Sequence, residues 1–522
     1  MNYSVWIFFL CIFFPPASIL AQPTFSRTYD LVGMQGSDRG ASVQAIGDDF
    51  VIGVGSLCNG YYNACTGLIK TNNAGDVLWQ FYYDQFTEDI YPNWKDDFFL
   101  RGDTLFFASE MRKGPEADWQ YYLAKASWQN SGLYSLADFG SAEGDYATSL
   151  EPLPDNRWML FGFGWRQGKW KPVLNVVQND SIIEASYYLD FPYSAGENDG
   201  MLEPLPDGDY ITAVQTKTPV LPFTGLAVSK VDSLGNIIWS RHFNDSLSIG
   251  CRRRITPLQN GGFAVVNCTD TAYNISPYYS WAADKVIGLD SVGNTAWEYF
   301  FHAPSWKRIH NITLAQNGDI LGCGIDNSYP DGQGGVRLSG FVFRMSPEGQ
   351  LLWERRFIND ATHLYADILL LDDICEAPDG RIAVVGLQSN LFPNGTPNGD
   401  AWLLVLDENG CLEPGCTERD YVISGQEEPV QQPAAANPAW FHLYPQPAGD
   451  WLTVNFDRDL PPRCRLLLHS ALGRLEMEQP LTAGQQQATL DTSGLPAGLY
   501  VLALATQDGQ LLHTQKVLVN NK

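Results

Sequence analysis

Three consecutive arginines, at positions 252 to 254, could bind a carboxylate or a sulfate. The planar guanidinium group donates parallel hydrogen bonds to a planar anion, which suits arginine to this chemistry. In a β-strand, however, successive side chains point to opposite sides, so Arg253 would face away from Arg252 and Arg254. This alternation favours a solvated strand edge, and an anion site is the alternative.

Acidic residues occur in two patterns that resemble known sites without fitting them. Asp326 and Asp331 lie in a Gly-rich loop that could hold Ca²⁺ through oxygen ligands, but the spacing is not that of an EF-hand, and a loop without metal is favoured. Asp232 precedes Gly235 by three residues, whereas in the Asp boxes of sialidases the Asp precedes the Gly by two residues. We therefore predict that Asp232 and Asp290 accept backbone N–H bonds within turns.

No sequence pattern identifies a catalytic group or a resident cofactor. The chain contains no H-E-x-x-H, P-loop or Ser-His-Asp pattern, and its seven histidines are scattered. The paired carboxylates of a glycosidase would come from separate loops and would leave no local signature. We predict no cofactor and no metal, with Ca²⁺ as the one candidate ion.

The composition excludes two classes of partner. The formal net charge is −26, and phosphate backbones and anionic membrane surfaces require clustered Lys and Arg. We therefore expect no nucleic-acid partner. The length of 522 residues and the 45% of hydrophobic residues are sufficient for a large core and more than one domain.

The N-terminus has the features of a secretory signal. Val5 to Phe14 form an apolar run that is too short to span a bilayer, and small residues follow as far as Ala21. The usual Lys or Arg before the run is missing. We predict a signal peptide over residues 1–21, cleaved between Ala21 and Gln22, with an uncleaved anchor as the alternative. No later stretch predicts a transmembrane helix.

The cysteines predict disulfides, because such bonds persist in exported proteins. Ten are present, and removal of Cys11 with the signal leaves an odd number. The predicted pairs are Cys58–Cys65, Cys251–Cys268 and Cys411–Cys416. Cys323–Cys375 is a fourth candidate pair, and Cys464 would remain free. For each pair the alternative is two buried cysteines without a disulfide.

One repeated unit extends from about residue 40 to residue 410. Its turns are centred at Gly75, Gly132, Asn179, Gly235, Gly293, Gly349 and Gly410, at intervals of 47 to 61 residues. A second tight turn rich in Gly, Asn and Asp lies between successive copies, so each unit holds two hairpins and four strands. Seven such units predict an all-β fold, a seven-bladed β-propeller over residues 22–420.

Four copies of the unit have the pattern Gly-x-x-x-Trp. This pattern resembles that of pyrroloquinoline quinone dehydrogenases, whose propeller tryptophans dock one blade against the next. The chemistry of that family is not implied, because its members have eight blades and commonly a vicinal cysteine pair that is missing here. We predict packing between blades for Trp79, Trp239, Trp297 and Trp353.

The two ends of the repeat predict how the ring closes. The last unit has no outer strand after Ala401 to Leu406, whereas residues 25–30 resemble the outer strand at 239–244. We predict that residues 25–30 complete the last blade, which would remove an open sheet edge.

Loop lengths predict which face of the propeller could bind a ligand. The turns at one face are tight, whereas the connections at the other are long and carry Tyr and Trp, which supply contact area and a polar tip. Loops that only cover the blade ends are the alternative. The predicted ligand-face residues are Tyr61, Tyr62, Trp94, Trp165, Trp170, Tyr278, Trp281 and Tyr329.

The last part of the chain predicts a separate small domain. Residues 421–440 have the composition of a linker. From residue 441 to 522, short strand patterns alternate with Gly and Pro turns, which predicts a small Ig-like β-sandwich.

This tail resembles the type A C-terminal sorting domain of the Bacteroidetes type IX secretion system. The likeness rests on Leu443–Ala448, Leu472–Arg474, Leu490–Tyr500 and Lys516–Val519. The sorting-signal positions are Tyr444, Pro445, Pro447, Gly473, Arg474, Leu495, Gly498, Tyr500 and Lys516. The resemblance implies export across an outer membrane by the type IX machinery, and tail removal with anchoring to the cell surface or release. A sandwich that binds glycan or only completes the protein is the alternative.

Together these patterns predict a secreted or cell-surface protein whose propeller binds an extracellular glycan or protein. The alternatives are a propeller-type glycan hydrolase or lyase and a purely structural surface protein. An enzyme would bring two or three acidic, Tyr, His or Arg groups together at the centre of the long-loop face.

Overall fold

The computed structural model contains two compact units that divide between Val430 and Gln431. It describes residues 24–520 except 32–37, 59–62, 84–88, 93–97, 113–118, 130–132, 139–144, 179–181, 190–193, 218–223, 244–251, 270–282, 302–306, 331–335, 360–367, 392–396, 414, 424–439, 445–447, 450, 457–459, 461–462, 471–474, 483, 497 and 507–510. No helix that could cross a membrane is found among these residues.

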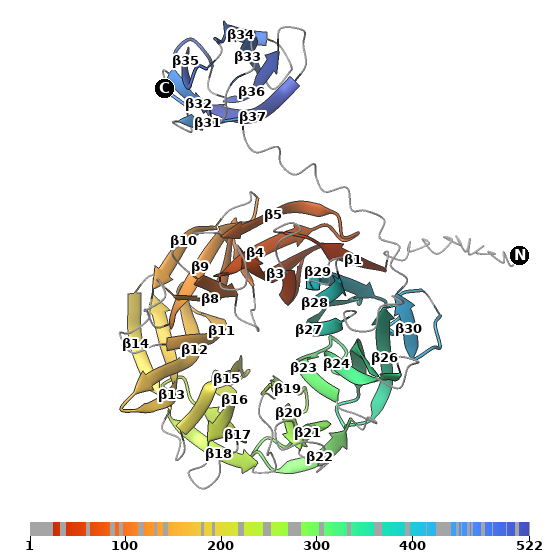
Figure 1. The fold of residues 1–522 in the computed structure, drawn as a ribbon. Coiled ribbons are helices and arrows are strands. Elements are labelled where there is room, and N and C mark those ends of the chain that lie inside the picture. The colour runs from red at the N-terminus through yellow and green to blue at the C-terminus, as the bar shows by residue number, and fades with distance from the viewer. Residues whose placement is uncertain are drawn as a thin grey trace, which may run out of the picture. The chain divides into compact units, whose positions relative to one another are not determined.

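The first unit is a seven-bladed β-propeller, which confirms the predicted fold class (Figure 1). Blades 1 to 3 consist of β2 (Asp38–Ile46), β3 (Asp49–Cys58), β4 (Asn63–Thr71) and β5 (Val77–Tyr83); β6 (Asp89–Pro92), β7 (Phe99–Arg101), β8 (Thr104–Arg112), β9 (Trp119–Ser127) and β10 (Leu133–Asp138); β11 (Asp145–Leu153), β12 (Arg157–Arg166), β13 (Lys169–Gln178) and β14 (Ile182–Tyr188). In blade 2, both β6 and β7 pair with β8.

Blades 4 to 6 consist of β15 (Ser194–Pro204), β16 (Tyr210–Lys217), β17 (Thr224–Val231) and β18 (Ile237–Phe243); β19 (Ile255–Pro257), β20 (Phe263–Thr269), β21 (Ala283–Leu289) and β22 (Thr295–Phe300); β23 (Lys307–Leu314), β24 (Ile320–Pro330), β25 (Val336–Met345) and β26 (Leu351–Asn359). Blade 7 consists of β27 (Leu369–Glu376), β28 (Ile382–Leu391), β29 (Pro397–Leu406) and β1 (Phe25–Tyr29). A single parallel pair between Ala283 and Lys307 joins blades 5 and 6.

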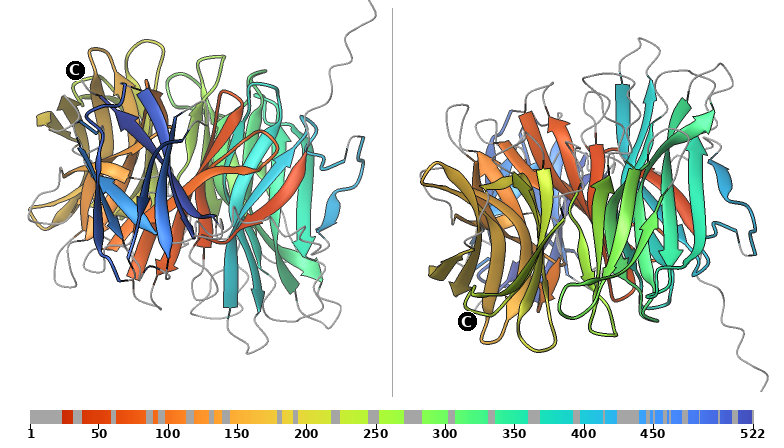
Figure 2. Two further views of the ribbon diagram at one scale, coloured as in Figure 1. Left: turned by 90° about the horizontal axis from the view of Figure 1, so that it is seen from above. Right: turned by 90° about the horizontal axis from the view of Figure 1, so that it is seen from below.

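The strands of each blade run between two faces of the propeller (Figure 2). The first-to-second and third-to-fourth strand turns lie at one face, which we call the turn face. The other connections lie at the opposite face, which we call the loop face. One of these connections is shorter than predicted, because β12 and β13 continue to the pair Arg166–Lys169 and leave only Gln167 and Gly168 as the turn.

The third-to-fourth strand turns of blades 4 and 5 share one hydrogen-bond pattern. Asp232 Oδ1 accepts the N–H groups of Leu234 at 2.9 Å and Asn236 at 2.8 Å, and Asp290 does the same in the next blade. The side-chain amide of Asn236 also donates to Asp232 Oδ2, at 2.8 Å, and contributes most to lowering the pKa of Asp232. The two backbone N–H bonds lower this pKa further, because they too favour the ionised form. The prediction that these aspartates are turn residues is confirmed.

The repeated Gly and Trp form the contact between successive blades. A Cβ atom at Gly293 would lie 2.6 Å from the Trp239 ring, and one at Gly349 would lie 2.5 Å from the Trp297 ring. Both glycines also have positive φ, so the close approach and the turn each require glycine. Trp297 Nε1 donates to the carbonyl of Pro347 at 3.0 Å. Trp239, Trp297 and Trp353 therefore each pack on the turn glycine of the following blade, as predicted, whereas Gly132, the corresponding glycine for Trp79, lies outside the described residues.

The first strand of the chain closes the ring. β1 pairs antiparallel with β29 from Phe25–Val405 to Tyr29–Ala401. The hydroxyl of Tyr29 donates to the carbonyl of Gly75 at 2.9 Å, and Phe25 contacts that glycine as the tryptophans contact theirs. The prediction that residues 25–30 complete the last blade is confirmed, with Tyr29 as the last residue of the strand.

The core of the propeller consists of seven hydrophobic clusters, each shared by two successive blades. This arrangement explains why the predicted Cys323–Cys375 pair is wrong, since both thiols are free. Cys323 belongs to the cluster between blades 6 and 7, whereas Cys375 packs against the cluster between blades 7 and 1. The sheet of blade 7 separates the two thiols.

A short strand, β30 (Asp420–Ile423), adds to blade 6 after the ring is complete. It pairs parallel with β26, Arg356 makes two hydrogen bonds to Asp420 at 2.8 and 2.7 Å, and Tyr421 stacks on Phe357. A disulfide joins Cys411 to Cys416 before this strand. The predicted linker therefore begins three residues too early, because its first residues are bound to the blade.

The second unit is a β-sandwich. One sheet contains β31 (Phe441–Tyr444), β32 (Trp451–Phe456) and β35 (Gln487–Asp491); the other contains β34 (Leu475–Pro480), β33 (Cys464–Ser470), β36 (Gly498–Thr506) and β37 (Leu511–Val519). Both sheets contribute to one buried cluster that includes Leu452, Leu468 and Leu502. The thiol of Cys464 is free and buried in this cluster.

Candidate functional site at the centre of the loop face

Four side chains meet where the innermost strands approach the loop face. Arg39 belongs to β2, Arg252 precedes β19, His310 lies in β23 and Asp372 lies in β27. The buried Asp372 accepts two bonds from Arg39, at 2.5 and 2.6 Å, and one from Arg252 at 2.8 Å. His310 Nδ1 lies 3.2 Å from Asp372 Oδ1. We call these residues the central arginine cluster, in which one carboxylate holds two guanidinium groups side by side.

β-Bulges place two members of the cluster. The pairing of β23 with β24 skips His310, and the pairing of β27 with β28 skips Asp372. A bulge changes the direction of the extra side chain relative to regular alternation. As a result, the consecutive residues His310 and Asn311 both contact β27, at the carbonyl of Leu371 and the carboxylate of Asp373.

The cluster has a net positive charge at neutral pH. Burial would raise the pKa of Asp372, but Arg39 and Arg252 outweigh burial and hold the pKa far below its usual range. Burial, reinforced by Arg252, lowers the pKa of His310 to about 4. Two cationic groups therefore face one carboxylate and a neutral imidazole. Because Nδ1 of His310 lies 2.8 Å from the carbonyl of Leu371, which only accepts, we assign the proton to Nδ1 and the lone pair to Nε2.

The residues next to the cluster are buried, which corrects the predicted solvated strand edge at the arginine triplet. Arg253 is 0% and Arg254 is 4% exposed. Asp284 of β21 faces Arg253 and Arg308, and its Oδ2 accepts the N–H of Ile309 at 2.6 Å. Its Oδ1 is buried without a hydrogen-bond partner among the described residues. Burial raises the pKa of Asp284 to about 7, against the opposing effects of that N–H and the two arginines.

Two of the eight predicted ligand-face residues lie together in blade 3. The rings of Trp165 and Trp170 are 5.3 Å apart, and Tyr146 lies 4.9 Å from Trp170. Trp165 is partly exposed, and Arg166 beside it donates to the hydroxyl of Tyr188 at 2.9 Å. We call this group the blade 3 aromatic cluster. It lies at the loop-face ends of β12 and β13.

Several other predicted residues lie outside the described part of the chain, or only their backbone is described. Tyr61, Tyr62, Trp94, Tyr278, Trp281, Cys251, Asp331 and the signal cleavage position at Ala21 and Gln22 lie outside the described residues. Tyr329, Cys58, Cys65 and Cys268 lie in strands, but their side chains are outside the described set.

The candidate calcium ligand Asp326 is surrounded by cationic groups. Its Oδ2 lies 3.3 Å from Lys307 Nζ and 3.8 Å from Arg356 Nη1. In the part of the chain that the structure describes, no group of three or more His, Cys, Asp or Glu side chains is arranged to hold a metal ion. An ion pair therefore accounts for the burial of Asp326.

The sorting-signal positions are distributed over the sandwich. Tyr444 is 65% exposed at the end of β31, whereas Leu495 packs against the core. The hydroxyl of Tyr500 donates to the carbonyl of Pro496 at 2.9 Å, close to Gly498 at the start of β36. Lys516 pairs with Val501 through the backbone of β37. Pro445, Pro447, Gly473 and Arg474 lie outside the described residues.

These features define an exported β-propeller protein with a separate sandwich domain. Residues 442–520 match the family described as the secretion system C-terminal sorting domain. The tail is therefore a type IX sorting domain, and the protein is exported by the type IX secretion machinery to the cell surface or the extracellular space. No curated protein matches the chain in sequence.

The chain has a low structural similarity to several solved structures of carbohydrate-active enzymes. The polysaccharide lyase Uly1 is 10% identical with a TM-score of 0.45, over 76% of this chain and 94% of that chain. The α-L-arabinanase of Penicillium chrysogenum is 12% identical with a TM-score of 0.38, over 61% and 93%. The NanB sialidase of Streptococcus pneumoniae is 9% identical with a TM-score of 0.36, over 74% and 69%. At these identities the likeness concerns the fold alone.

Three members of the central arginine cluster have no local sequence signature. Arg39, His310 and Asp372 come from three different blades, and the last two depend on bulges that a strand pattern does not reveal. The sequence features that could have indicated this cluster are Arg252 within the arginine triplet and the expected convergence of the innermost strands.

Proposed function

We propose that the loop face binds an extracellular glycan that carries carboxylate or sulfate groups, with Arg39 and Arg252 as its central contacts. The observation that carries this proposal is the pair of guanidinium groups at one buried carboxylate. Their side chains are 29% and 19% exposed, so both are accessible to a ligand. Within a chain of net charge −26, this local positive charge would attract an acidic ligand that the remaining surface repels.

The blade 3 aromatic cluster supports a glycan as the ligand class. Sugar rings present C–H groups on their faces, and the partly exposed Trp165 offers an aromatic surface for such a face. An extended glycan could contact this cluster and the arginines together, because both lie at the loop face.

The test is the binding of polygalacturonate and dextran sulfate to the full chain, with neutral dextran as the comparison. Arg252→Gln removes one guanidinium while Asp372 keeps both bonds to Arg39, so the fold should be retained. A hydrogen bond to a charged group contributes about 1.5–3 kcal/mol, which corresponds to a loss of affinity of roughly 10- to 100-fold.

The matched control is Arg157→Gln, which removes the same charge from an exposed pair with Glu184 at the turn-face end of β12. It should leave the affinity within about twofold, because the change lies away from the loop face. Equal binding of neutral dextran, or equal losses in the two variants, would contradict the proposal.

A glycan lyase is a second candidate, which the neutral His310 beside two guanidinium groups supports. In an elimination reaction, a base removes the proton from the carbon next to a uronate carboxylate while cationic groups neutralise that carboxylate. The C4–O glycosidic bond breaks, a C4=C5 double bond forms, and the departing sugar oxygen takes up a proton from water or from the protonated base. Nε2 of His310 carries a lone pair that can accept this proton, and the negative charge of a bound uronate would raise the low pKa of the imidazole toward the range of a general base. Incubation with polygalacturonate should then release unsaturated products detected by ultraviolet absorbance, and His310→Ala should abolish them without loss of binding. Binding without turnover would reject the lyase and retain the binding protein.

A further inference from the structure

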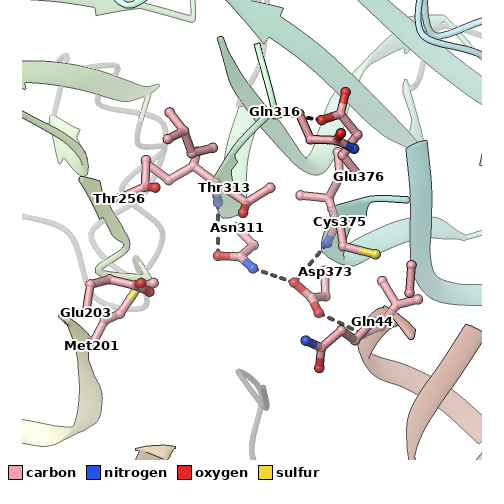
Figure 3. A pocket seen from close by; sticks show the side chains of 15 residues that line it. Gln44, Met201, Glu203, Thr256, Asn311, Thr313, Gln316, Asp373, Cys375 and Glu376 are labelled. Carbon is pink, nitrogen blue, oxygen red and sulfur yellow. Dashed lines mark hydrogen bonds between the residues drawn. The ribbon is translucent and has the colours of Figure 1, made fainter. Parts of the chain in front are cut away.

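A cavity opens at the turn-face ends of the innermost strands, apart from the central arginine cluster (Figure 3). Its volume is about 260 Å³. The lining comes from the last residues of β2, β23 and β27 and from β15 and β19. We call it the turn-face pocket. The bulges separate it from the central arginine cluster, since His310 and Asp372 belong to the cluster whereas the next residues, Asn311 and Asp373, line the pocket.

Hydrogen bonds fix one wall of the pocket. Asp373 accepts the backbone N–H of Val43 at 2.7 Å, the N–H of Ile374 at 2.8 Å and a bond from the side-chain amide of Asn311. Gln44 Oε1 accepts the N–H of Phe98 at 2.7 Å, which fixes a second amide. Residues from blades 1, 6 and 7 are thereby held together, and the wall is formed before any ligand arrives.

The polar groups of the pocket select the chemistry of an occupant. Thr256 and Thr313 supply hydroxyl groups, Glu203 supplies a carboxylate on the same side as Thr256, and Gln44 supplies an amide on the opposite side (Figure 3). The described lining residues include neither Lys nor Arg, and no aromatic ring. Glu203 and Asp373 would repel an anion, and an apolar molecule would offer no hydrogen-bond partner to the hydroxyl groups of Thr256 and Thr313.

We propose that the turn-face pocket binds a neutral, polyhydroxylated ligand of the size of one sugar unit. Sugar hydroxyls donate and accept hydrogen bonds at once, and they match a lining that mixes hydroxyls, amides and carboxylates. The volume suits a single ring rather than an oligosaccharide. The site differs from the proposed acidic-glycan site in its residues, its face and its charge preference.

The experiment is saturation-transfer NMR on the full chain with glucose, galactose, mannose and xylose at millimolar concentration. Glucuronate and glucosamine are the charged comparisons. The double variant Thr256→Val, Thr313→Val replaces two hydroxyls with methyl groups of similar size and leaves the strands intact. At least one neutral sugar should give a transfer signal that falls at least fivefold in the double variant.

Two further variants make the result specific. Thr295→Val changes an exposed threonine of the outer strand β22 in the same way and should leave the signal unchanged. Arg252→Gln should also leave it unchanged, which separates this proposal from that for the loop face. No signal from any neutral sugar, a signal that persists in the double variant, or binding of glucuronate or glucosamine alone would overturn the proposal.

Discussion

Replacement of Asp284 by Asn should stabilise the propeller by an amount that depends on pH. The buried carboxyl group has a pKa raised from 3.8 to about 7. Asn has nearly the same shape, its side-chain oxygen can still accept the N–H of Ile309, and it cannot ionise. The variant therefore removes the cost of a buried negative charge and leaves the packing nearly unchanged.

The sign and the magnitude follow from proton linkage. The folded state binds the Asp284 proton more tightly than the unfolded state, so the free energy of unfolding falls as pH rises from about 4 to about 7. A difference of about three pKa units at 1.36 kcal/mol each gives ~4 kcal/mol as the largest effect. Asp284→Asn should equal the unsubstituted protein in stability near pH 4 and exceed it by up to ~4 kcal/mol near pH 8.

Urea unfolding followed by tryptophan fluorescence between pH 5 and pH 8 measures this difference. The control is Asp290→Asn in the same blade, where N–H bonds from Asn294 and Val292 lower the pKa of an exposed carboxylate. Asp290→Asn should be less stable than the unsubstituted protein at pH values above the pKa of Asp290 in the unfolded state. This difference in stability should vanish as pH falls through the pKa of Asp290 in the folded state. A stability difference for Asp284→Asn that stays constant from pH 5 to pH 8 would refute the reasoning.

Two further predictions concern the contacts between blades. Trp297→Ala should lower the free energy of unfolding by ~3 kcal/mol, because it removes a large ring and the hydrogen bond from Nε1 to the carbonyl of Pro347. Thermal unfolding should show a lower midpoint in the variant. An unchanged midpoint would contradict the packing role of Trp297. Tyr29→Phe should cost about 1 kcal/mol through loss of the bond to the Gly75 carbonyl at the closure of the ring. Chemical denaturation would measure it, with Tyr444→Phe in the sandwich as a control that should have no effect on the propeller transition.

The architecture was predictable because it depends on local repeats. The turn glycine of one blade and the tryptophan of the preceding blade recur at fixed spacing, so Gly293 and Trp239 are visible in the sequence before their contact is known. The same holds for β1, whose pattern repeats that of an outer strand. Turn chemistry, as at Asp232, is equally local.

The candidate sites were only partly predictable, because they depend on convergence between blades. Strand alternation led to the wrong expectation for Arg253, which is buried and faces Asp284. The bulges at His310 and Asp372 break the alternation on which such an expectation rests. The Cys323–Cys375 pairing was wrong because sequence spacing does not reveal on which side of a blade a side chain lies.

The closure of the ring by β1 fixes the order in which the propeller can be completed. The bond from Trp402 Nε1 to Ser26 Oγ, 2.8 Å long, joins residues that are 376 positions apart, whereas the other blades pair strands that are near neighbours in the chain. Closing so long a loop costs more entropy than forming a hairpin, so blade 7 should form last. Until residues 397–406 have emerged, the chain is an open arc in which β1 has no pairing partner and β28 has one open edge. The ring can therefore close only after all seven blades have been synthesised. A truncated chain would expose unpaired strand edges that proteases or chaperones can bind.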